Sequence, residues 1–340
     1  MPARDRRRIW ARGREEVAVA LAVSKDAPAV SGGGPSPRPS GPAAWSVRSR
    51  RLGLGFVVPV VVFVAVFYLY PLGRNVVLSF QDYGIKSLYS GKAPFNGLDN
   101  YTKLLGDPVF HTAAVNTLVF VAGSLFFQFT IGLGLAEFFH RAFPLSQLLR
   151  ALLLIPWLLP LVVSGTLFRW MLDTSNGVVN QILLNLHLVQ HPVPWLNDPG
   201  TAMVAVLVCN VWIGVPFNMV ILYGGLQAVP AELYEAASLD GAGRRQQFRH
   251  ITLPQLRPVI GVVLTLGLIY TLKVFDVIWV MTKGGPANAT HTVTTYAYQL
   301  SFGGLAEFGL GAAAGNLLIV VAAVFALFYL RSLRAEAENH

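Results

Sequence analysis

Charged residues are scarce in this chain. Asp, Glu, Lys and Arg make up 13% of its 340 residues, whereas hydrophobic residues make up 54%. Soluble proteins carry about 25% charged residues, so this composition excludes an ordinary water-soluble domain. The scarcity of charge indicates an integral membrane protein.

Cysteine and clustered catalytic groups are also lacking. Cys209 is the single cysteine, which excludes an internal disulfide and leaves the redox compartment open. Histidines and carboxylates are too scattered for a metal site, and no Ser/His/Asp grouping is evident. We therefore expect no metal, no cofactor and no enzyme activity in this chain.

The net charge of +9 does not indicate a nucleic-acid partner, because lysines and arginines cluster beside apolar segments, as in other membrane proteins. A spanning helix needs about 20 mostly apolar residues. The sequence therefore predicts an all-α integral membrane protein with six transmembrane helices. The six segments are residues 52–72, 112–138, 146–171, 201–227, 258–281 and 308–330.

Basic residues outside the spans concentrate before the first span and after the second, fourth and sixth. Cytoplasmic loops carry such an excess, so we expect both termini in the cytoplasm. Residues 1–50 combine a basic run with a stretch rich in Gly, Pro and Ser, which predicts a disordered tail. Residues 51–335 then form the membrane domain, and residues 228–257 form a cytoplasmic loop within it.

The loop between the fourth and fifth spans has a defined pattern. Residues 231–239 are mostly good helix formers, and Pro230 suits the first turn of a helix. Gly241 can take a positive φ and end that helix. Residues 244–251 predict a second, basic helix that stops before Pro254. Two short helices at an angle would form a knob on the cytoplasmic face.

This knob has two possible uses. Ala236 and Ala237 keep one side small enough for another protein to approach closely, with positive charge around it from Arg244, Arg245 and Arg249. A basic amphipathic helix can instead lie on anionic lipid. The residues alone leave protein docking and lipid binding both open.

Polar and small residues inside the spans are the candidates for a substrate pathway. In the fourth span, Asn210 can donate and accept hydrogen bonds, Gly214 allows close approach, and Phe217 offers an aromatic face that suits a sugar ring. In the fifth span, Lys273 and Asp276 lie three residues apart, and we expect them to pair on one helix face near its outer end.

The cytoplasmic loop resembles the signature of binding-protein-dependent ABC importer permeases. Glu235-Ala236-Ala237 is followed after three residues by Gly241, and after nine more by Ile251-Thr252-Leu253-Pro254. The resemblance runs from about residue 52 onward. It favours the sugar-permease branch, in particular the maltose (MalF-like) or glycerol-phosphate (UgpA-like) subunit. Further matching stretches are residues 96–101, 116–117, 194–199, 275–276 and 282–286.

The resemblance implies the type I importer (MetI-like) permease fold and two functional regions. The loop would be the coupling helix that docks on a separate ATPase, and the sugar site would lie in the fourth and fifth spans. For coupling, the residues are Glu235, Ala236, Ala237 and Gly241, to which we add Asp240, Arg244 and Arg245 beside them. For the substrate pathway, they are Asn210, Gly214, Phe217, Gly267, Tyr270 and Thr271.

ATP hydrolysis would come from another chain, because the pair Gly91-Lys92 lacks the upstream glycine of a P-loop. The resemblance thus implies a permease subunit of an ATP-driven carbohydrate importer in the bacterial cell membrane. Its partners would be a second, MalG-like permease, two cytoplasmic ATPase subunits that use ATP and Mg, an extracytoplasmic binding protein, the sugar and membrane lipid.

Two alternatives remain open. A glycerol-3-phosphate importer would need a basic pocket, which Lys273 could supply only weakly. An ion-driven secondary transporter would need buried acidic relays, and the spans offer mainly Asp276. The long extracytoplasmic insertion that maltose-type permeases can carry is absent, so docking of the binding protein is expected to differ.

Overall fold

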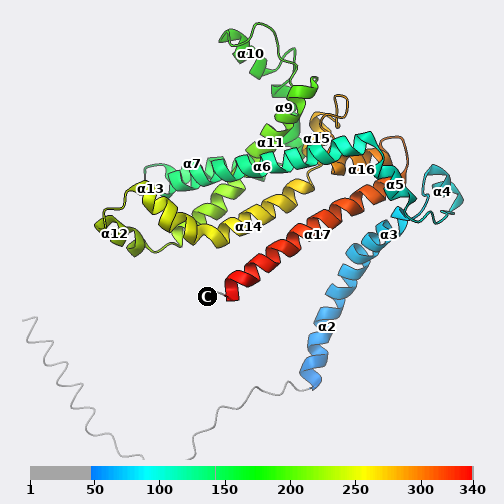
Figure 1. Cartoon of the computed structure of the whole chain (residues 1–340), viewed down its shortest axis with the longest axis horizontal. Helices are drawn as coiled ribbons and strands as arrows, with labels where there is room; N and C mark the ends of the chain where they lie inside the picture. The colour runs from blue at the N-terminus through cyan, green and yellow to red at the C-terminus, as the bar shows by residue number, and fades with distance from the viewer. Residues whose placement is uncertain (1–46, 142, 339–340) are drawn as a thin grey trace, which may run out of the picture. The chain divides into compact units, whose positions relative to one another are not determined.

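Helices form the regular structure of the described part of the chain, residues 47–141 and 143–338 of a computed structural model (Figure 1). Within those residues the only strand-like feature is an isolated bridge between Gln81 and Phe95. The all-α class is therefore confirmed. The predicted tail, residues 1–50, lies almost wholly outside the described residues. The helices are α2 (Val47–Val64), η1 (Ala65–Leu69), α3 (Tyr70–Ser79), α4 (Ile85–Ser90), α5 (Asp99–Leu105), α6 (Pro108–His140), α7 (Ser146–Leu153), α8 (Ile155–Leu158), α9 (Leu161–Met171), α10 (Val178–Asn185), α11 (Pro199–Gln227), α12 (Ala231–Leu239), α13 (Arg244–Gln247), η2 (Phe248–Thr252), α14 (Leu253–Leu272), α15 (Asp276–Met281), α16 (Val293–Phe302) and α17 (Phe308–Glu338).

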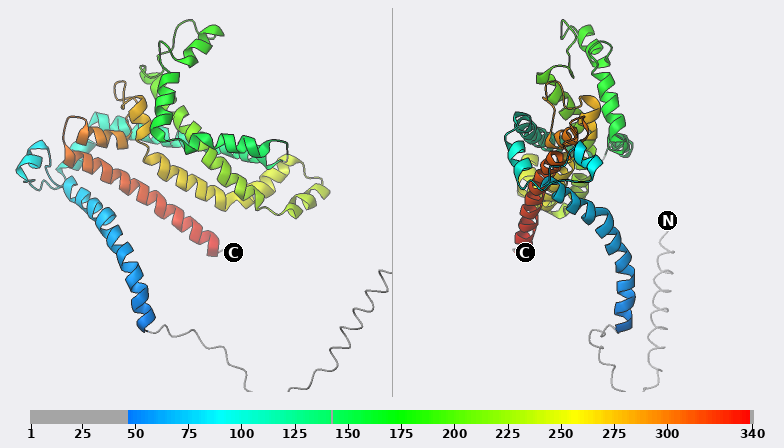
Figure 2. Two further views of the ribbon diagram at one scale, coloured as in Figure 1. Left: turned by 180° about the vertical axis from the view of Figure 1, so that it is seen from behind. Right: turned by 90° about the vertical axis from the view of Figure 1, so that its right-hand side faces the viewer.

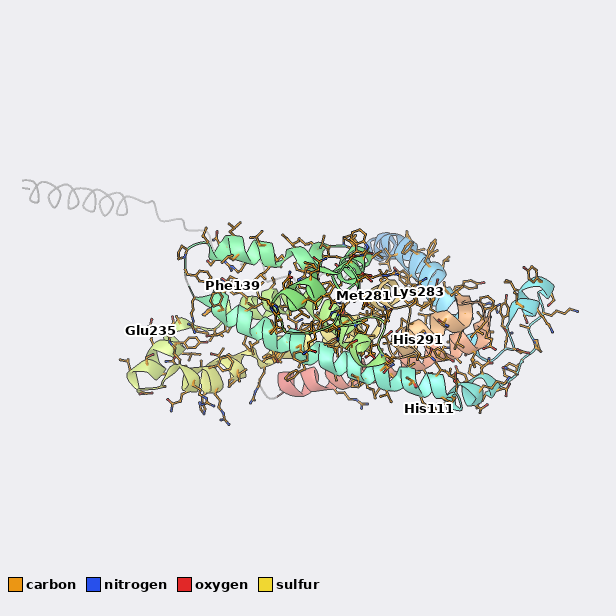
Figure 3. The ribbon with its side chains drawn as sticks, turned by 90° about the horizontal axis from the view of Figure 1, so that it is seen from above. His111, Phe139, Glu235, Met281, Lys283 and His291 are labelled. Carbon is orange, nitrogen blue, oxygen red and sulfur yellow. The ribbon has the colours of Figure 1, made fainter. Side chains whose placement is uncertain are left out.

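Two units divide the chain, residues 1–62 and 63–340. The core of the second unit is the contact between the long helices α6 and α11, with α14 packed on both. Fully buried residues such as Phe120, Met219 and Leu222 fill this contact. Figure 2 shows the three helices side by side from behind. In the view of Figure 3, Glu235 lies at one end of this layer and His111 lies toward the other.

Five helical segments in the described residues are long and apolar enough to cross a membrane. They are Val57–Ser79, Pro108–His140, Pro199–Gln227, Arg244–Leu272 and Phe308–Leu327. A sixth crossing would be Ser146–Leu158 joined to Leu161–Met171. All six predicted apolar spans thus have a helical counterpart, but three differ from the prediction.

The predicted third span, residues 146–171, is not a straight helix, because its two halves meet at 95°. Pro160 has no backbone N–H and restricts the residue before it to extended backbone. Leu159 accordingly has φ −72° and ψ 143°. The proline therefore ends α8, and a new helix, α9, begins at Leu161.

The first and fifth spans extend beyond the predicted residues at one end, and in each a proline lies within the helix without ending it. The predicted stop before Pro254 is wrong: α13, η2 and α14 form one continuous helix. A π-helical turn precedes Pro254, in which Leu253 N–H donates to Phe248 O, five residues back. The first span repeats this device, since Tyr70 N–H donates to Ala65 O just before Pro71. In each case one π-helical turn accommodates the proline, so that the helix continues past it.

The fifth span also ends earlier than predicted. It stops at Leu272 instead of residue 281, and residues 273–275 interrupt the helix before α15. Thr294 at the start of α16 donates a hydrogen bond of 2.9 Å to the Leu272 carbonyl. A side chain distant in sequence therefore satisfies a carbonyl that the helix end leaves free.

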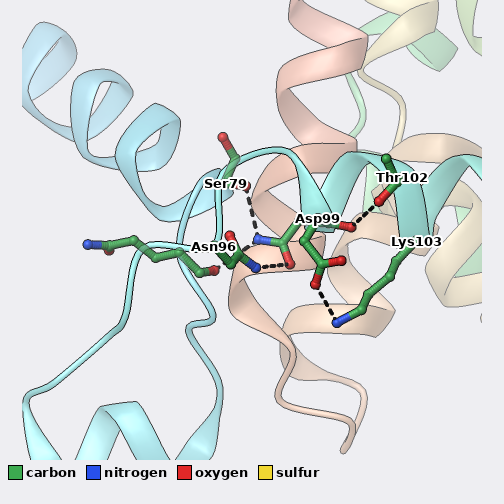
Figure 4. A network of polar contacts seen from close by, with 7 residues as sticks. Ser79, Asn96, Asp99, Thr102 and Lys103 are labelled. Carbon is green, nitrogen blue, oxygen red and sulfur yellow. Dashed lines mark hydrogen bonds and ion pairs between the residues drawn. The ribbon is translucent and has the colours of Figure 1, made fainter.

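Residues 96–101 include the start of α5, and hydrogen bonds attach them to the end of α3 (Figure 4). Asn100, only 6% exposed, donates to the carbonyls of Ser79 and Gln81, each at 2.9 Å. The Ser79 hydroxyl lies 2.8 Å from the Tyr101 hydroxyl. Residues 96–101, which resemble the sugar-permease branch in sequence, therefore have a structural role in these contacts.

Replacing Asn100 by alanine is expected to cost about 1–3 kcal/mol of stability, because two carbonyls lose a buried donor. Thr102→Ala is the control. It also removes a hydrogen bond to a carbonyl, that of Asp99, but at an exposed site. Thermal unfolding of the purified protein in detergent would compare them. Equal shifts in Tm would show that burial of Asn100 is unimportant.

Candidate functional site

A cavity of about 620 Å³ lies among α6, α8, α11 and α14, beside two breaks in the helices. All six residues predicted for the substrate pathway lie on its wall. Asn210, Gly214 and Phe217 come from α11, and Gly267, Tyr270 and Thr271 come from α14. The structure therefore brings these residues together, while their role in transport remains a prediction.

The sequence did not single out several residues of this wall. Gln128 enters from α6, Asn218 lies on α11 and Trp157 lies on α8. Each lies inside or beside an apolar segment, and only the packing of α6, α8 and α11 shows that they face one space. A single polar residue in a span is the one signal that could have identified Gln128.

Both helix breaks open onto this cavity. Leu159 and Pro160 line it where α8 turns into α9, and residues 273–276 line it between α14 and α15. A broken helix leaves backbone groups without their usual partners, which membrane proteins tolerate where the backbone lines a cavity. These breaks thus give the cavity polar backbone in an apolar region.

The polar wall of the cavity is built where α6 packs on α11. Gln128 Nε2 donates to the Asn210 carbonyl at 2.9 Å, and Asn210 Nδ2 donates to Ser124 Oγ at 2.9 Å. A Cβ at Gly214 would lie 2.3 Å from Gln128 Cδ. We expected Gly214 to admit a ligand or backbone, whereas the Gln128 side chain occupies this space.

Aromatic rings line a second side of the cavity. The Trp157 and Phe217 ring centroids are 5.7 Å apart, and those of Phe217 and Tyr270 are 6.0 Å apart with the rings nearly perpendicular. Lys273 Nζ lies 4.8 Å from the centroid of the Tyr270 ring, a cation–π distance. Apolar ring faces and a cation therefore stand beside the polar wall.

The predicted pairing of Lys273 with Asp276 is wrong. Between residues 47 and 338 the only ion pair of the described side chains joins Lys103 and Asp99. Lys273 follows the last residue of α14 and Asp276 begins α15, so the two do not share a helix face. Both line the cavity instead.

The loop of residues 282–292 is held from α6. Asn116 Nδ2 donates to the carbonyls of Asn288, Ala289 and His291 at 3.1–3.3 Å. The His291 ring lies where a Cβ at Gly284 would be, and its Nδ1 is 3.2 Å from Thr295 Oγ1. Burial lowers the pKa of His291, so the imidazole is neutral at physiological pH.

A second contact secures the helix that follows this loop. The Tyr296 hydroxyl on α16 donates to the carboxylate of Asp107, which also caps α6 by accepting from Val109 N–H. Burial, together with this hydrogen bond, raises the pKa of Tyr296. Tyr296 therefore stays protonated and ties α16 to the start of α6.

The loop between α11 and α14 forms the predicted first helix and glycine turn. Helix α12 spans Ala231–Leu239 as predicted, and Gly241 has a φ of +80°. Gln247 Nε2 donates to Ser238 Oγ at 2.9 Å and to the Ala242 carbonyl at 3.1 Å, which fixes α13 against α12. The angle between the two helices is thus set by hydrogen bonds as well as by the turn.

This knob presents side chains that the protein itself does not cover. Glu235, Ala236, Arg244 and Arg245 are exposed, and Leu239 is 90% exposed. Leu239 is a large apolar side chain at the tip of this knob, with charged residues near it in the sequence. No residue of α12 or α13 lines the cavity, and Glu235 lies at one end of the layer formed by α6, α11 and α14 (Figure 3).

Comparison with known proteins bears on both regions. Residues 128–335 match the family of binding-protein-dependent transport system inner membrane components. The sulfoquinovosyl glycerol transport permease SmoG of Agrobacterium fabrum is 36% identical over 292 residues, covering 84% of this chain and 92% of that protein. The trehalose/maltose permease MalF of Thermococcus litoralis is 34% identical over 284 residues, covering 84% and 94%.

Solved structures give the same result for the fold. A bacterial ABC transporter that imports the acidic polysaccharide alginate contains a chain 26% identical to this one, with a TM-score of 0.73 and coverage of 85% of this chain and 97% of that chain. A second structure of such a transporter, bound to a periplasmic protein that carries an alginate pentasaccharide, has a TM-score of 0.72 at 25% identity, covering 84% and 95%.

Proposed function

This chain belongs to the family of binding-protein-dependent transport system inner membrane components, and we propose that it is one of two permease subunits of an ATP-driven carbohydrate importer. The observation that carries this proposal is the cavity whose wall joins Asn210, Gly214 and Phe217 to Tyr270 and Thr271. Aromatic faces beside amide groups suit a ligand with both ring faces and hydroxyls.

The relatives support a carbohydrate as the substrate. The two permeases described above are named for sulfoquinovosyl glycerol and for trehalose and maltose, and others are named for lactose and arabinooligosaccharides. Membership in this family argues against an ion-coupled secondary transporter. Glycerol 3-phosphate is the weaker alternative, because Asp276 shares the cavity with Lys273 and offsets its charge.

The exposed knob of α12 and α13 supports coupling to a motor outside this chain. Glu235, Ala236 and Gly241 would contact an ATPase subunit that uses ATP and Mg, with Asp240, Arg244 and Arg245 beside them. A second permease, two ATPase subunits and an extracytoplasmic binding protein would complete the machine. Both termini would lie in the cytoplasm, on the side of the knob.

The mechanism would be alternating access. Closure of the ATPase subunits would move the knob, and the continuous helix from Arg244 to Leu272 would carry that motion to the cavity wall. The binding protein would deliver the sugar from the opposite side. Exposure of the cavity would then alternate between the two sides of the membrane.

Proteoliposomes containing this chain with its co-encoded permease, ATPase and binding protein provide the test. We expect uptake of radiolabelled maltose, trehalose or lactose that depends on ATP. Omission of the ATPase, or of this chain, should remove the uptake. Uptake by this chain alone, driven by an ion gradient, would contradict the proposal.

A further inference from the structure

Three buried amide side chains share the polar wall of the cavity. Gln128, Asn210 and Asn218 are 5%, 6% and 4% exposed, and all three line the cavity. Amides carry donors on nitrogen and acceptors on oxygen. Which end faces the cavity therefore decides what the wall can bind.

In each of the three, the amide nitrogen donates one hydrogen bond within the protein. Gln128 Nε2 donates to the Asn210 carbonyl, and Asn218 Nδ2 donates to the Gly214 carbonyl, both at 2.9 Å. A backbone carbonyl can only accept, so these two amides must turn their nitrogen toward it. Asn210 Nδ2 donates to Ser124 Oγ at 2.9 Å.

The oxygen ends are not used in the same way. No hydrogen bond from a described residue reaches Gln128 Oε1, Asn210 Oδ1 or Asn218 Oδ1. These oxygens are also not sealed in the protein, since the fully buried unpartnered atoms among the described residues belong to Gln81, Asn96 and Ser164. Three acceptor oxygens without a partner among the described residues therefore keep some exposed surface, on side chains that line the cavity.

The spacing of the two helices arranges these acceptors in a row. On α11, Asn210, Gly214 and Asn218 recur every four residues and so share one face. On α6, Ser124, Gln128 and Gly132 have the same spacing and lie against them in order, with Gly132 packed on the Cβ of Asn218. Gly214 leaves the gap into which Gln128 fits, which places its amide between the other two. The row spans about 12 Å at 1.5 Å per residue.

We propose that Gln128, Asn210 and Asn218 form a row of hydrogen-bond acceptors that selects neutral, hydroxyl-bearing substrates, with Gln128 as a specificity-determining residue. A sugar hydroxyl can donate to each oxygen. A carboxylate, sulfonate or phosphate offers these three oxygens only further acceptors, and its negative charge would be repelled by their partial negative charges. This inference rests on the proposed function, and it names the substrate class of that site.

The test uses the full complex in proteoliposomes with ATP. Neutral probes are maltose, trehalose and lactose, and anionic probes are lactobionate and glycerol 3-phosphate. We expect ATP-dependent uptake of a neutral probe at least ~10-fold faster than that of an anionic probe. Preferential uptake of an anionic probe would overturn the inference alone. If no probe is taken up with ATP, the proposed function fails, and the inference fails with it.

Analogues of the transported sugar then test the direction of the hydrogen bonds. Replacing one hydroxyl by fluorine keeps a weak acceptor but removes the donor. At the positions that face the row, the deoxyfluoro and deoxy analogues should both lose ~10-fold in uptake relative to the sugar. A deoxyfluoro analogue transported as well as the sugar at every position would show that the wall does not accept from hydroxyls, and would overturn the proposal.

Variants test whether the loss of uptake with these analogues depends on Gln128. Gln128→Met keeps the length of the side chain but has no carbonyl, and should lower uptake of the sugar ~10-fold. One deoxyfluoro analogue should then show no further loss, a coupling that a merely structural role would not produce. Gln227→Met is the control, because this glutamine is exposed and lies outside the cavity. The same binding protein is present in every arm, so the ratios report on the permease. Additive losses in Gln128→Met would contradict a contact between Gln128 and the sugar.

Discussion

Replacing Gly241 by valine is expected to reduce ATP-driven uptake at least about 10-fold, while valine at Gly243 is tolerated. Gly241 has a φ of +80°, in the left-handed region, where a side chain costs about 1–2 kcal/mol and a β-branched one costs more. The chain would leave this conformation, and α12 would point elsewhere relative to α13. The contact surface that we propose for Glu235 and Ala236 would then no longer fit the proposed ATPase subunit.

Gly243 is a matched control for this change. It lies two residues away in the same loop, but its φ of −71° and ψ of 164° suit any residue. A Cβ at either position meets nothing within 4 Å, so the two variants differ in backbone strain alone. Uptake, and stimulation of the ATPase by the binding protein, should be measured together. Equal losses in both variants would show that the turn conformation does not matter for coupling.

Replacing Gly214 by valine should also reduce uptake by about 10-fold or more. The new Cβ would lie 2.3 Å from Gln128 Cδ and Nε2, so the amide must leave its place. Overpacking of this kind costs about 1–3 kcal/mol, and the displaced amide loses its hydrogen bond to the Asn210 carbonyl. The valine side chain and the displaced Gln128 side chain would also reduce the volume of the cavity.

The control for Gly214 is Gly224 on the same helix. A Cβ at Gly224 meets nothing within 4 Å, and the residue is exposed. Gly224→Val should therefore leave uptake close to that of the unmodified protein. Tm in detergent would show how much of the Gly214→Val effect is a loss of folded protein. A full loss of uptake at Gly224 would indicate that substitutions in α11 act generally and not through the cavity.

Local chemistry explains which features were predictable from the sequence. The bounds of α12 follow from helix formers between Pro230 and a glycine turn, and both signals act within a few residues. The apolar segments follow from composition alone. The residues of the substrate pathway could be named because the motif resembles that of a family, and the structure brings all six to one cavity.

Features that depend on distant contacts were not predictable. Pro254 was expected to end a helix, but a π-helical turn absorbs it, as another absorbs Pro71. The end of α14 at Leu272 depends on Thr294, 22 residues away. The contact between Gln128 on α6 and Gly214 on α11 depends on the packing of the two helices and cannot be read from the sequence. The break before Pro160, by contrast, follows from a local rule and was missed because the apolar run continues across it.

The continuous helix from Arg244 to Leu272 has a mechanical consequence. Its 29 residues extend about 44 Å at 1.5 Å per residue, with the knob at one end and Tyr270 and Thr271 at the other. Such a helix acts as a lever. A tilt of about 5° around its midpoint displaces each end by about 2 Å in opposite directions. Had Pro254 broken the helix, a hinge would have separated the two ends, and the same tilt at Arg244 would have been lost in bending.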